Sequence, residues 1–235
     1  MNRIAIIAAL AAELKPLVRG WQHESRLGVD LWHGRHGGDE WIAACAGAGV
    51  DAAMRALAEI ERTGAIDLVL SIGWAGALRE ELASGRAYRV TGVVDARTGE
   101  RFRAAAPPGT EECWLVTSPR FADHAEKRHL AAATGASLVD MEAAGIARAA
   151  VKRGIPFQCI KGVSDGFTDR LPDFNRFISA QGKLQWARFV LFVLLRPRHW
   201  PALMRMGENS RKAAQGLRQS LLDLLDERGS AGSSG

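Results

Sequence analysis

Short apolar segments alternate with segments of helical periodicity along this chain, and this alternation restricts the fold more than any other feature. Residues 3–9 ("RIAIIAA"), 67–78 ("DLVLSIGWAGAL") and 156–165 ("PFQCIKGVSD") are typical of buried strands. Residues 49–64, with apolar side chains every three or four positions, are typical of a helix that ends at Gly64. Strands that alternate with helices favour an α/β domain with a mostly parallel sheet and right-handed crossovers.

The rest of the chain continues this pattern. Further helices are expected at 10–19, 141–153, 175–195 and 207–226, and further strands at 88–96, 113–118 and 137–140. Residues 30–46 predict two strands joined at Gly37-Gly38, the segment 67–78 is expected to run into a glycine-rich loop, and residues 97–112 predict a turn or surface loop. We expect one domain over 1–228 and a flexible tail over 229–235 ("GSAGSSG").

The composition indicates a soluble globular protein and excludes several function classes. Of 235 residues, 47% are apolar and 24% charged, and the net charge of +5 is too small to predict nucleic-acid binding without a Lys/Arg run. Three widely spaced cysteines predict no disulfide framework and no metal site, and they suit the cytoplasm. The first residues are similar to a signal peptide, but Glu13 and Lys15 interrupt the apolar run, which favours a first core strand.

Acidic residues and glycines stand where several expected strands end. Ligands of parallel sheets bind at the carboxyl ends of the strands, so these positions are the candidates for a site. Each has an ordinary explanation by itself: a glycine for a tight turn, an acidic residue for the start of a helix, an aspartate for a cap. Their occurrence together favours a ligand site. They are Glu13, "GAG" at 47–49, "GWAG" at 73–76, "DME" at 140–142 and "SDGF" at 164–167.

Five segments, in order, make the sequence resemble the nucleoside phosphorylase and nucleosidase superfamily, in particular its methylthioadenosine/S-adenosylhomocysteine nucleosidase-like branch. They are "IAIIAALAAELKPL", "AGAGVDAA", "SIGWAGAL", "VDMEAAGIARAA" and "IKGVSDG", within about residues 3–165. The resemblance is strongest to the hopanoid-associated phosphorylases, through "DARTGERF", "AEKRHLAAATGASLVDME" and "LRPRHWPALMRMGENSRKAAQGL". It implies a three-layer α/β/α sandwich with a central mixed, mostly parallel sheet, and a homo-oligomer.

The resemblance also implies chemistry at individual residues. Breaking an N-glycosidic bond to a purine develops positive charge on the ribose and negative charge on the base. Glu142 matches the family's ribose-binding glutamate, which accepts hydrogen bonds from the 2′- and 3′-hydroxyls, and Met141 offers the sugar an apolar face. Asp165 matches the general acid that protonates purine N7, a role that burial favours, and Glu13 matches the residue that positions or deprotonates the attacking water.

Three further residues are implied as substrate-binding. Phe121, in "VTSPRF", either stacks on the base or is an ordinary packing residue, and Ser164 and Gly73 adjoin the matched motifs. Asp140 is expected to do no more than place a charge at the start of a helix. Neither a metal nor a cofactor is implied.

Two departures from the family pattern favour hydrolysis over phosphorolysis. Trp74 stands where the family usually has a small Ser or Thr-like residue, so the indole either crowds the anion or water pocket or turns outward into a partner subunit. The segment before it also lacks the arginine that phosphorylases carry there. Arg35 and Arg55 are candidate substitutes, although each is more simply explained as a surface residue.

Residues 186–206 mix aromatic, leucine and arginine residues. The apolar run Phe189–Leu195 is too short to span a bilayer, which requires about 20 residues. It belongs either to a core or subunit interface, or to a segment that lies on a membrane. Arg196, Arg198 and Arg205, close in sequence to Trp200, suit an anionic membrane surface or an acidic partner equally well.

We therefore expect a cytoplasmic purine nucleosidase that releases adenine from a 5′-substituted adenosine, of which adenosylhopane is one candidate. A lipid substrate of this kind would favour peripheral membrane contact. The first alternative is a purine nucleoside phosphorylase that uses inorganic phosphate in the same site. The second is a non-catalytic nucleoside-binding protein on the same fold.

Overall fold

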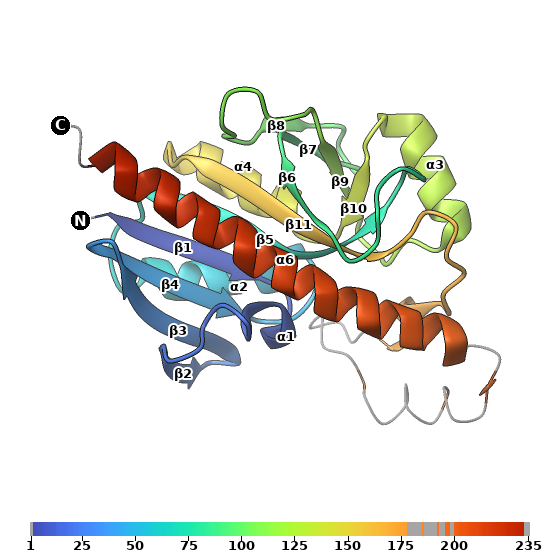
Figure 1. Ribbon diagram of the computed structural model, residues 1–235, viewed down its shortest axis with the longest axis horizontal. Helices are drawn as coiled ribbons and strands as arrows, with labels where there is room; N and C mark the ends of the chain where they lie inside the picture. Colours follow the sequence, from blue (N-terminus) through green and yellow to red (C-terminus); the bar gives the residue numbers. More distant parts are fainter. Residues whose placement is uncertain (1, 178–184, 186–191, 193–195, 198–199, 233–235) are drawn as a thin grey trace.

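A single mixed sheet of 11 strands runs through the structure, a computed structural model that describes residues 2–177, 185, 192, 196–197 and 200–232 (Figure 1). The strand order is β2-β3-β4-β1-β5-β10-β9-β7-β8, and β11 pairs with both β5 and β6. The strands are β1 (Arg3–Ala8), β2 (Gln22–Arg26), β3 (Val29–His36), β4 (Asp39–Cys45), β5 (Leu68–Ala77), β6 (Ala87–Val90), β7 (Gly92–Asp95), β8 (Arg101–Arg103), β9 (Trp114–Thr117), β10 (Leu138–Asp140) and β11 (Phe157–Asp165).

The pairing pattern brings several strand ends to one place. Strands β4, β1, β5 and β11 form parallel pairs, as do β10, β9 and β7, but β10 runs antiparallel to β5. Val139 of β10 and Asp165 of β11 are both paired with Gly76 of β5. The carboxyl ends of β10 and β11 therefore meet at β5, where the strand direction reverses. Such a reversal is where ligands bind in sheets of this class.

Helices cover both faces of the sheet and produce three layers (Figure 1). Helices α2 and α4 pack on one face, and α1 and α6 pack on the other. The helices are α1 (Ala11–Leu14), α2 (Val50–Glu61), α3 (His124–Thr134), α4 (Ala143–Arg153) and α6 (Trp200–Gly232), with a 3₁₀ turn η1 at Phe174–Phe177. The predicted α/β sandwich with a mixed sheet is confirmed.

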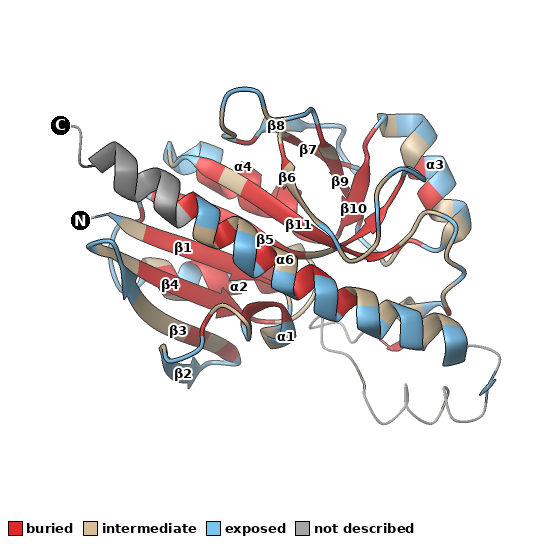
Figure 2. Cartoon of the chain, viewed as in Figure 1, coloured by how far each residue is buried: buried red, intermediate tan, exposed pale blue. Residues whose placement is uncertain are grey.

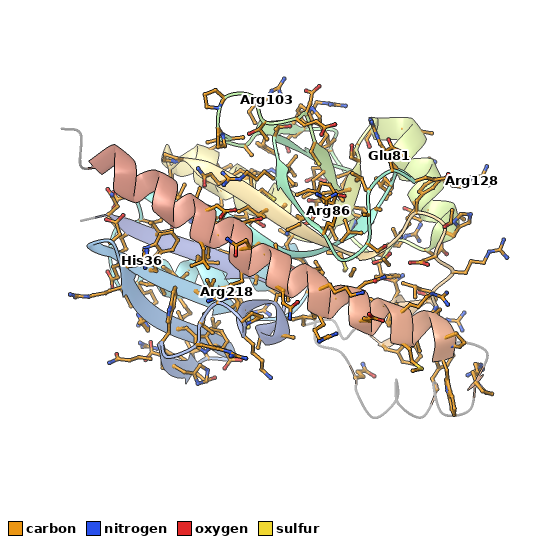
Figure 3. All side chains as sticks on the ribbon, viewed as in Figure 1. His36, Glu81, Arg86, Arg103, Arg128 and Arg218 are labelled. Carbon is orange, nitrogen blue, oxygen red and sulfur yellow. The ribbon has the colours of Figure 1, made fainter. Side chains whose placement is uncertain are left out.

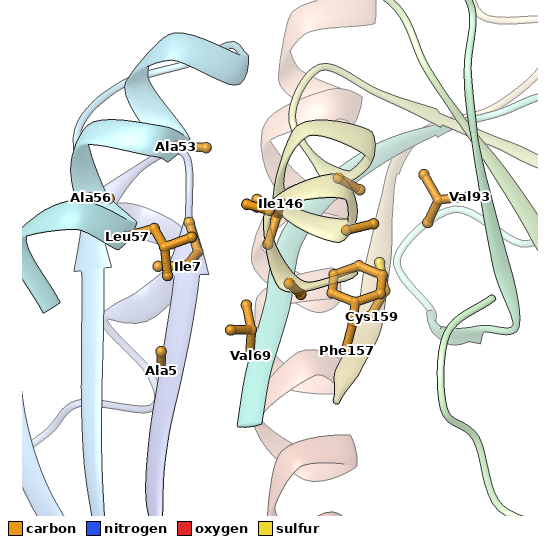
Figure 4. Packing of buried hydrophobic residues seen from close by; sticks show 14 of the residues in the cluster. Ala5, Ile7, Ala53, Ala56, Leu57, Val69, Val93, Ile146, Phe157 and Cys159 are labelled. Carbon is orange, nitrogen blue, oxygen red and sulfur yellow. The ribbon is translucent and has the colours of Figure 1, made fainter. Parts of the chain in front are cut away.

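Strand β1 shows why the sequence has continuous apolar runs rather than alternating ones. Ala5 and Ile7 face the α2–α4 layer, where Figure 4 shows them near Leu57. Ile4 and Ile6, on the opposite face, belong to the cluster under α6. A strand covered on both faces buries every side chain and therefore reads as uniformly apolar.

Helix α6 lies along the sheet and presents a narrow apolar stripe to it. Ala213, Leu217, Leu221 and Leu224 are buried at intervals of three or four residues, while the opposite side of the helix is exposed (Figure 2). Burial of this stripe is what holds α6 against the strands. The helix begins before and ends after the predicted range 207–226.

Several predicted elements are corrected by the structure. The "GWAG" segment is not a loop but the end of β5, the range 88–96 forms two strands, and 97–112 contains β8. Helix α1 ends before Pro16, because the residue preceding a proline is disfavoured in helical conformation. Strand β2 and helix α3 were not predicted.

Most of the apolar run predicted at Phe189–Leu195 lies outside the described residues, as does most of the helix expected at 175–195. The ring of Phe192, which is described, lies 5.0 Å from that of Phe177. Among the helices that the structure describes, none is long and apolar enough to cross a bilayer.

Candidate active site

A cavity lies at the carboxyl ends of β1, β10 and β11 and is closed on one side by α6. Its volume of about 1240 Å³ exceeds the ~300–1,000 Å³ that is usual for small-molecule sites. It brings together residues that are far apart in the sequence. Six of the seven predicted site residues line it: Glu13, Phe121, Met141, Glu142, Ser164 and Asp165.

Three backbone amides hold the carboxylate of Glu13. Its Oε2 accepts hydrogen bonds from the N–H of Ala9 (2.9 Å) and Leu10 (2.8 Å), and its Oε1 accepts one from the N–H of Trp74 (2.7 Å). Burial raises the pKa of Glu13, and these amides oppose the rise. The carboxyl group is thus fixed at the floor of the cavity, 4% exposed.

Gly73, the seventh predicted residue, serves this arrangement from behind. It is not among the described residues that line the cavity. A Cβ atom at this position would lie 2.8 Å from Glu13 Oε1, and the φ angle of +144° also favours glycine. Gly73 therefore leaves the space that the Glu13 carboxylate occupies.

Glu142 precedes α4, at the N-cap position, and its side chain faces the cavity. Its Oε1 accepts a hydrogen bond from the N–H of Gly49 (2.7 Å), and its Oε2 accepts a longer one from the N–H of Met141 (3.3 Å). Burial, assisted by the nearby charge of Asp140, raises the pKa of Glu142 to about 7. The N–H of the "GAG" loop thus holds a protein carboxylate.

Asp140 supports Glu142 from below through both of its oxygens. Oδ1 accepts a hydrogen bond from Thr117 Oγ1 (2.7 Å), and Oδ2 accepts one from the N–H of Ala143 (3.0 Å), at the start of α4. The predicted role at a helix start is confirmed. In addition, Oδ2 pairs with Lys161 Nζ at 2.9 Å, a contact that the sequence did not predict.

Asp165 ends β11 between a hydroxyl and an ammonium group. Ser164 Oγ donates to Asp165 Oδ1 at 2.7 Å, and Oδ2 forms an ion pair with Nζ of Lys127, which lies on α3. Lys127 is 2% exposed, and it also lines the cavity. Sequence analysis missed this lysine because it missed α3, although Asp123 and Gly135, which cap the helix, were readable signals.

Aromatic rings form another part of the cavity wall. The rings of Phe121 and Phe174 are 4.7 Å apart in an edge-to-face arrangement, and both line the cavity. The side chain of Asn175 binds the backbone of Phe121, accepting from its N–H (2.8 Å) and donating to its carbonyl (3.0 Å). The phenyl group is thus presented on a fixed backbone, as a surface for a flat ligand ring.

Trp74 takes neither of the two orientations expected for it. Its indole Nε1 donates to the carbonyl oxygen of Ser210 at 3.1 Å, so the ring is directed to α6 of the same chain. The ring also packs on the apolar cluster under that helix. Trp74 therefore joins the catalytic side of the cavity to the α6 wall.

The basic residues of the cavity lie at its mouth. Lys15, Arg19, Arg120, Arg211 and Arg218 line the opening with exposed side chains, and Figure 3 labels Arg218 on α6. Arg35 and Arg55 are also exposed but are not among the described residues that line the cavity. At the cavity floor, the described cation is the ammonium of Lys127.

Comparisons with known proteins agree with this geometry. A family model described as "Phosphorylase superfamily" matches residues 3–114 and 113–190. Among solved structures, the 5′-methylthioadenosine/S-adenosylhomocysteine nucleosidase of Helicobacter pylori gives a TM-score of 0.73 at 18% identity, over 97% of this chain and 99% of that one. No significant match was found among curated protein sequences.

Two further solved structures are similar over nearly the whole chain. The 5′-methylthioadenosine nucleosidase of Arabidopsis thaliana has a TM-score of 0.74 at 17% identity, covering 96% of this chain and 95% of that one. The futalosine hydrolase of Helicobacter pylori has a TM-score of 0.73 at 17% identity, covering 96% and 98%. At these identities the likeness establishes a shared fold.

Proposed function

The chain belongs to the phosphorylase superfamily, and from this premise we propose that it is a nucleosidase that hydrolyses the N-glycosidic bond of a 5′-substituted adenosine to release adenine. One observation carries the proposal: the buried carboxyl groups of Glu13, Glu142 and Asp165 line a single cavity beside the ring of Phe121. That set matches the needs of N-glycosidic cleavage, which are a sugar anchor, a water activator, a proton route and a surface for the base.

Each group has a defined task in the proposed reaction. Ionised Glu142 accepts hydrogen bonds from the 2′- and 3′-hydroxyls, and Met141 contacts the sugar. The C1′–N9 bond breaks with its electron pair going to the purine, and Asp165 passes a proton to N7. Glu13 takes a proton from water as the water oxygen bonds to C1′. Ser164 orients the Asp165 carboxyl, and Phe121 stacks on the base.

The cavity favours water over phosphate as the nucleophile. A phosphate beside C1′ requires nearby cations, whereas the arginines that line the described part of the cavity are exposed at its mouth. Trp74, bound to α6, occupies the position where the family has a small residue. Glu13 is held by three amides next to this position, where it can orient a water molecule.

Incubation of the protein with adenosine, 5′-methylthioadenosine and S-adenosylhomocysteine, with and without phosphate, tests the proposal by chromatography of the products. Release of adenine and a free sugar without phosphate is the expected result. Dependence on phosphate, with a sugar 1-phosphate product, would identify a phosphorylase. Binding without cleavage would identify a nucleoside-binding protein and overturn the proposal.

The size of the cavity and the nature of its α6 wall bear on the 5′ substituent. Leu203, Met206 and Ala214 line the wall, and the volume of about 1240 Å³ leaves room beyond a nucleoside. We therefore propose a bulky apolar 5′ group, for which adenosylhopane is one candidate. A steeper loss of kcat/KM for adenosine than for derivatives with long alkyl groups at the 5′ position is expected, and equal values would refute a bulky substituent.

A lipid-like substrate would bring this cytoplasmic enzyme to a membrane surface, and we propose that residues 186–206 make this peripheral contact. Sedimentation with anionic liposomes should carry down the unmodified chain but not a variant with Glu at Arg196, Arg198 and Arg205. Equal partitioning of the two would remove the membrane proposal. We also propose a homo-oligomer, which light scattering after gel filtration would detect.

A further inference from the structure

We propose that Lys127 is a positioning residue for Asp165, and that the Lys127–Asp165 pair together stores the proton taken up by the departing purine. The proposal rests on the nucleosidase function proposed above and deepens it. It replaces the sequence-based expectation of a simple protonated acid at Asp165. In the pair, the resting proton is on the lysine, and Asp165 is the carboxylate through which it reaches the base.

The contacts of Lys127 leave its ammonium fully engaged at the end of β11. The Nζ atom donates to Asp165 Oδ2, to the carbonyl of Gly166 at 2.7 Å and, at 3.5 Å, to the carbonyl of Asp165 itself. An ammonium group has three donors, so these contacts account for all of them. The other oxygen of Asp165 is bound by Ser164 Oγ. Every one of these contacts converges on Asp165 or the residue that follows it.

The backbone around the pair is shaped to admit it. Gly76 lies opposite Asp165 in the β5–β11 ladder. A Cβ atom on Gly76 would lie 3.0 Å from Asp165 Oδ2 and 3.0 Å from Lys127 Cε. Any larger residue would therefore press on both members of the pair. The space at Gly76 is filled by the acid and the lysine together.

Electrostatics determines where the proton is held. Lys127 and Asp165 are each 2% exposed. An ammonium in contact with a buried carboxylate favours the charged form of both groups, because either charge alone would be costly to bury. A neutral Asp165 would leave Lys127 charged and without its counterion. The pair as a unit therefore holds one transferable proton, on Lys127.

The transfer balances in atoms and charge. As the C1′–N9 bond breaks, its electron pair goes to the purine, N7 takes a proton from the Asp165 carboxyl, and Asp165 takes one from Lys127. Lys127 is left as a neutral amine, and adenine is neutral. The water oxygen bonds to C1′ while its proton goes to Glu13, so the net charge of the site is unchanged. Proton return from Glu13 through solvent restores Lys127 when the products leave.

A second buried lysine provides a matched control within the same chain. Lys161 pairs with Asp140 at 2.9 Å and is as deeply buried as Lys127, but it is not among the described residues that line the cavity. Loss of Lys161 removes a buried ion pair without touching the acid. Its effect on the protein therefore reports the structural consequence of losing such a pair.

The experiment compares two leaving groups. Adenine in 5′-methylthioadenosine needs a proton to leave, whereas the nitrophenolate of 4-nitrophenyl β-D-ribofuranoside does not. Lys127→Met is expected to lower kcat for the purine by about 100-fold or more, with KM changed less than about threefold and the nitrophenyl riboside affected less than about fivefold. Lys161→Met should lower both activities by a common factor.

Two further variants separate proton storage from charge alone. Lys127→Arg keeps a positive charge that cannot be given up, so it should restore the unfolding midpoint and nitrophenyl cleavage but not purine cleavage. In a background with Asp165→Asn, Lys127→Met should add less than about threefold, because Lys127 acts through Asp165. The double variant also removes both buried charges, which keeps the test usable if Lys127→Met alone does not fold.

Opposite outcomes would overturn the proposal. Equal losses with both leaving groups in Lys127→Met, or full purine activity in Lys127→Arg, would show that Lys127 only supports the structure. Unchanged purine cleavage in Lys127→Met would also refute it. If the unmodified protein releases neither adenine nor nitrophenol, the proposed nucleosidase function itself has failed, and this result is distinct from the others.

Discussion

The ammonium of Lys161 and the carboxylate of Asp140 lie 2.9 Å apart, with both side chains almost fully enclosed by protein. Burial alone would lower the pKa of Lys161, but the Asp140 carboxylate raises it above its ordinary value, so the lysine stays charged. The same carboxylate binds the first amide of α4. This pair therefore anchors the helix start on which Glu142 is mounted.

Asp140→Asn is expected to lower the free energy of unfolding by about 3–5 kcal/mol, because it leaves Lys161 buried without its counterion. The double variant Asp140→Asn/Lys161→Met removes both charges and should recover most of that loss. Urea denaturation of the two variants and the unmodified chain measures this. An equally unstable double variant would show that the loss arises from the α4 hydrogen bond and not from the unpaired charge.

The activity should depend on the ionisation of Glu142. With a pKa of about 7, this carboxyl group is half protonated near neutral pH, and only its charged form accepts bonds from both ribose hydroxyls. The value of kcat/KM is therefore expected to rise with pH up to about 7 and then to level off. Glu142→Gln should lower kcat/KM at least about 100-fold and remove this rise. A limb that persists in the variant would assign it to another group, such as Glu13.

The stability of the protein should show the same group with the opposite trend. The pKa of Glu142 is raised from 4.5 to about 7 on folding, so the folded chain binds the proton more tightly. Stability from this group is complete below about pH 4.5 and is lost as the pH rises through about 7. Glu142→Gln cannot ionise, and its thermal midpoint should exceed that of the unmodified chain above pH 7 but match it near pH 4. Parallel midpoints across this range would contradict the assignment.

Trp74 should contribute more to the seating of α6 than to the chemistry. Trp74→Phe removes the hydrogen bond to the Ser210 carbonyl and should cost about 0.5–1.5 kcal/mol in unfolding free energy. Trp74→Ala also removes the ring and should cost about 3–5 kcal/mol. If the α6 wall holds the 5′ group, Trp74→Ala should raise KM for long 5′ substituents while KM for adenosine changes little. Equal rises for both substrates would place the ring at the nucleoside itself.

The close approach of α2 and α4 depends on Gly145. A Cβ atom there would lie 2.3 Å from Val50 Cγ1, so Gly145→Ala should destabilise the fold by about 1–3 kcal/mol. Gly207 in α6 is a matched control, because its Cβ would meet nothing within 4 Å. Gly207→Ala should stabilise the helix by up to about 1 kcal/mol. Opposite signs in thermal melts are the expected result, and a neutral Gly145→Ala would mean that the helices can separate at little cost.

The cavity floor was accessible from the sequence because its residues follow strands directly. Glu13, Glu142 and Asp165 each lie at or just past the end of an apolar run, and parallel pairing brings such ends together. The strands are short and apolar on both faces, so their order along the chain was readable. The start of α4 at Asp140 was readable for the same reason.

The partners of these residues were not accessible, because they depend on contacts between distant elements. Lys127 looks like an ordinary exposed helix residue until α3 packs against the end of β11. Lys161 lies within an apolar strand, and nothing nearby in the sequence identifies Asp140 as its counterion. The direction of the Trp74 ring depends on α6, which is more than 120 residues further along the chain.

The division of the cavity between two distant parts of the chain has a consequence for how such a protein diversifies. The reacting groups all precede residue 166, whereas the facing wall comes from Leu203 to Arg218 of α6. Exposed and intermediate positions on that helix can be exchanged without moving a single buried carboxylate. One helix can therefore be retuned for a new molecular cargo while the bond-breaking apparatus is inherited intact.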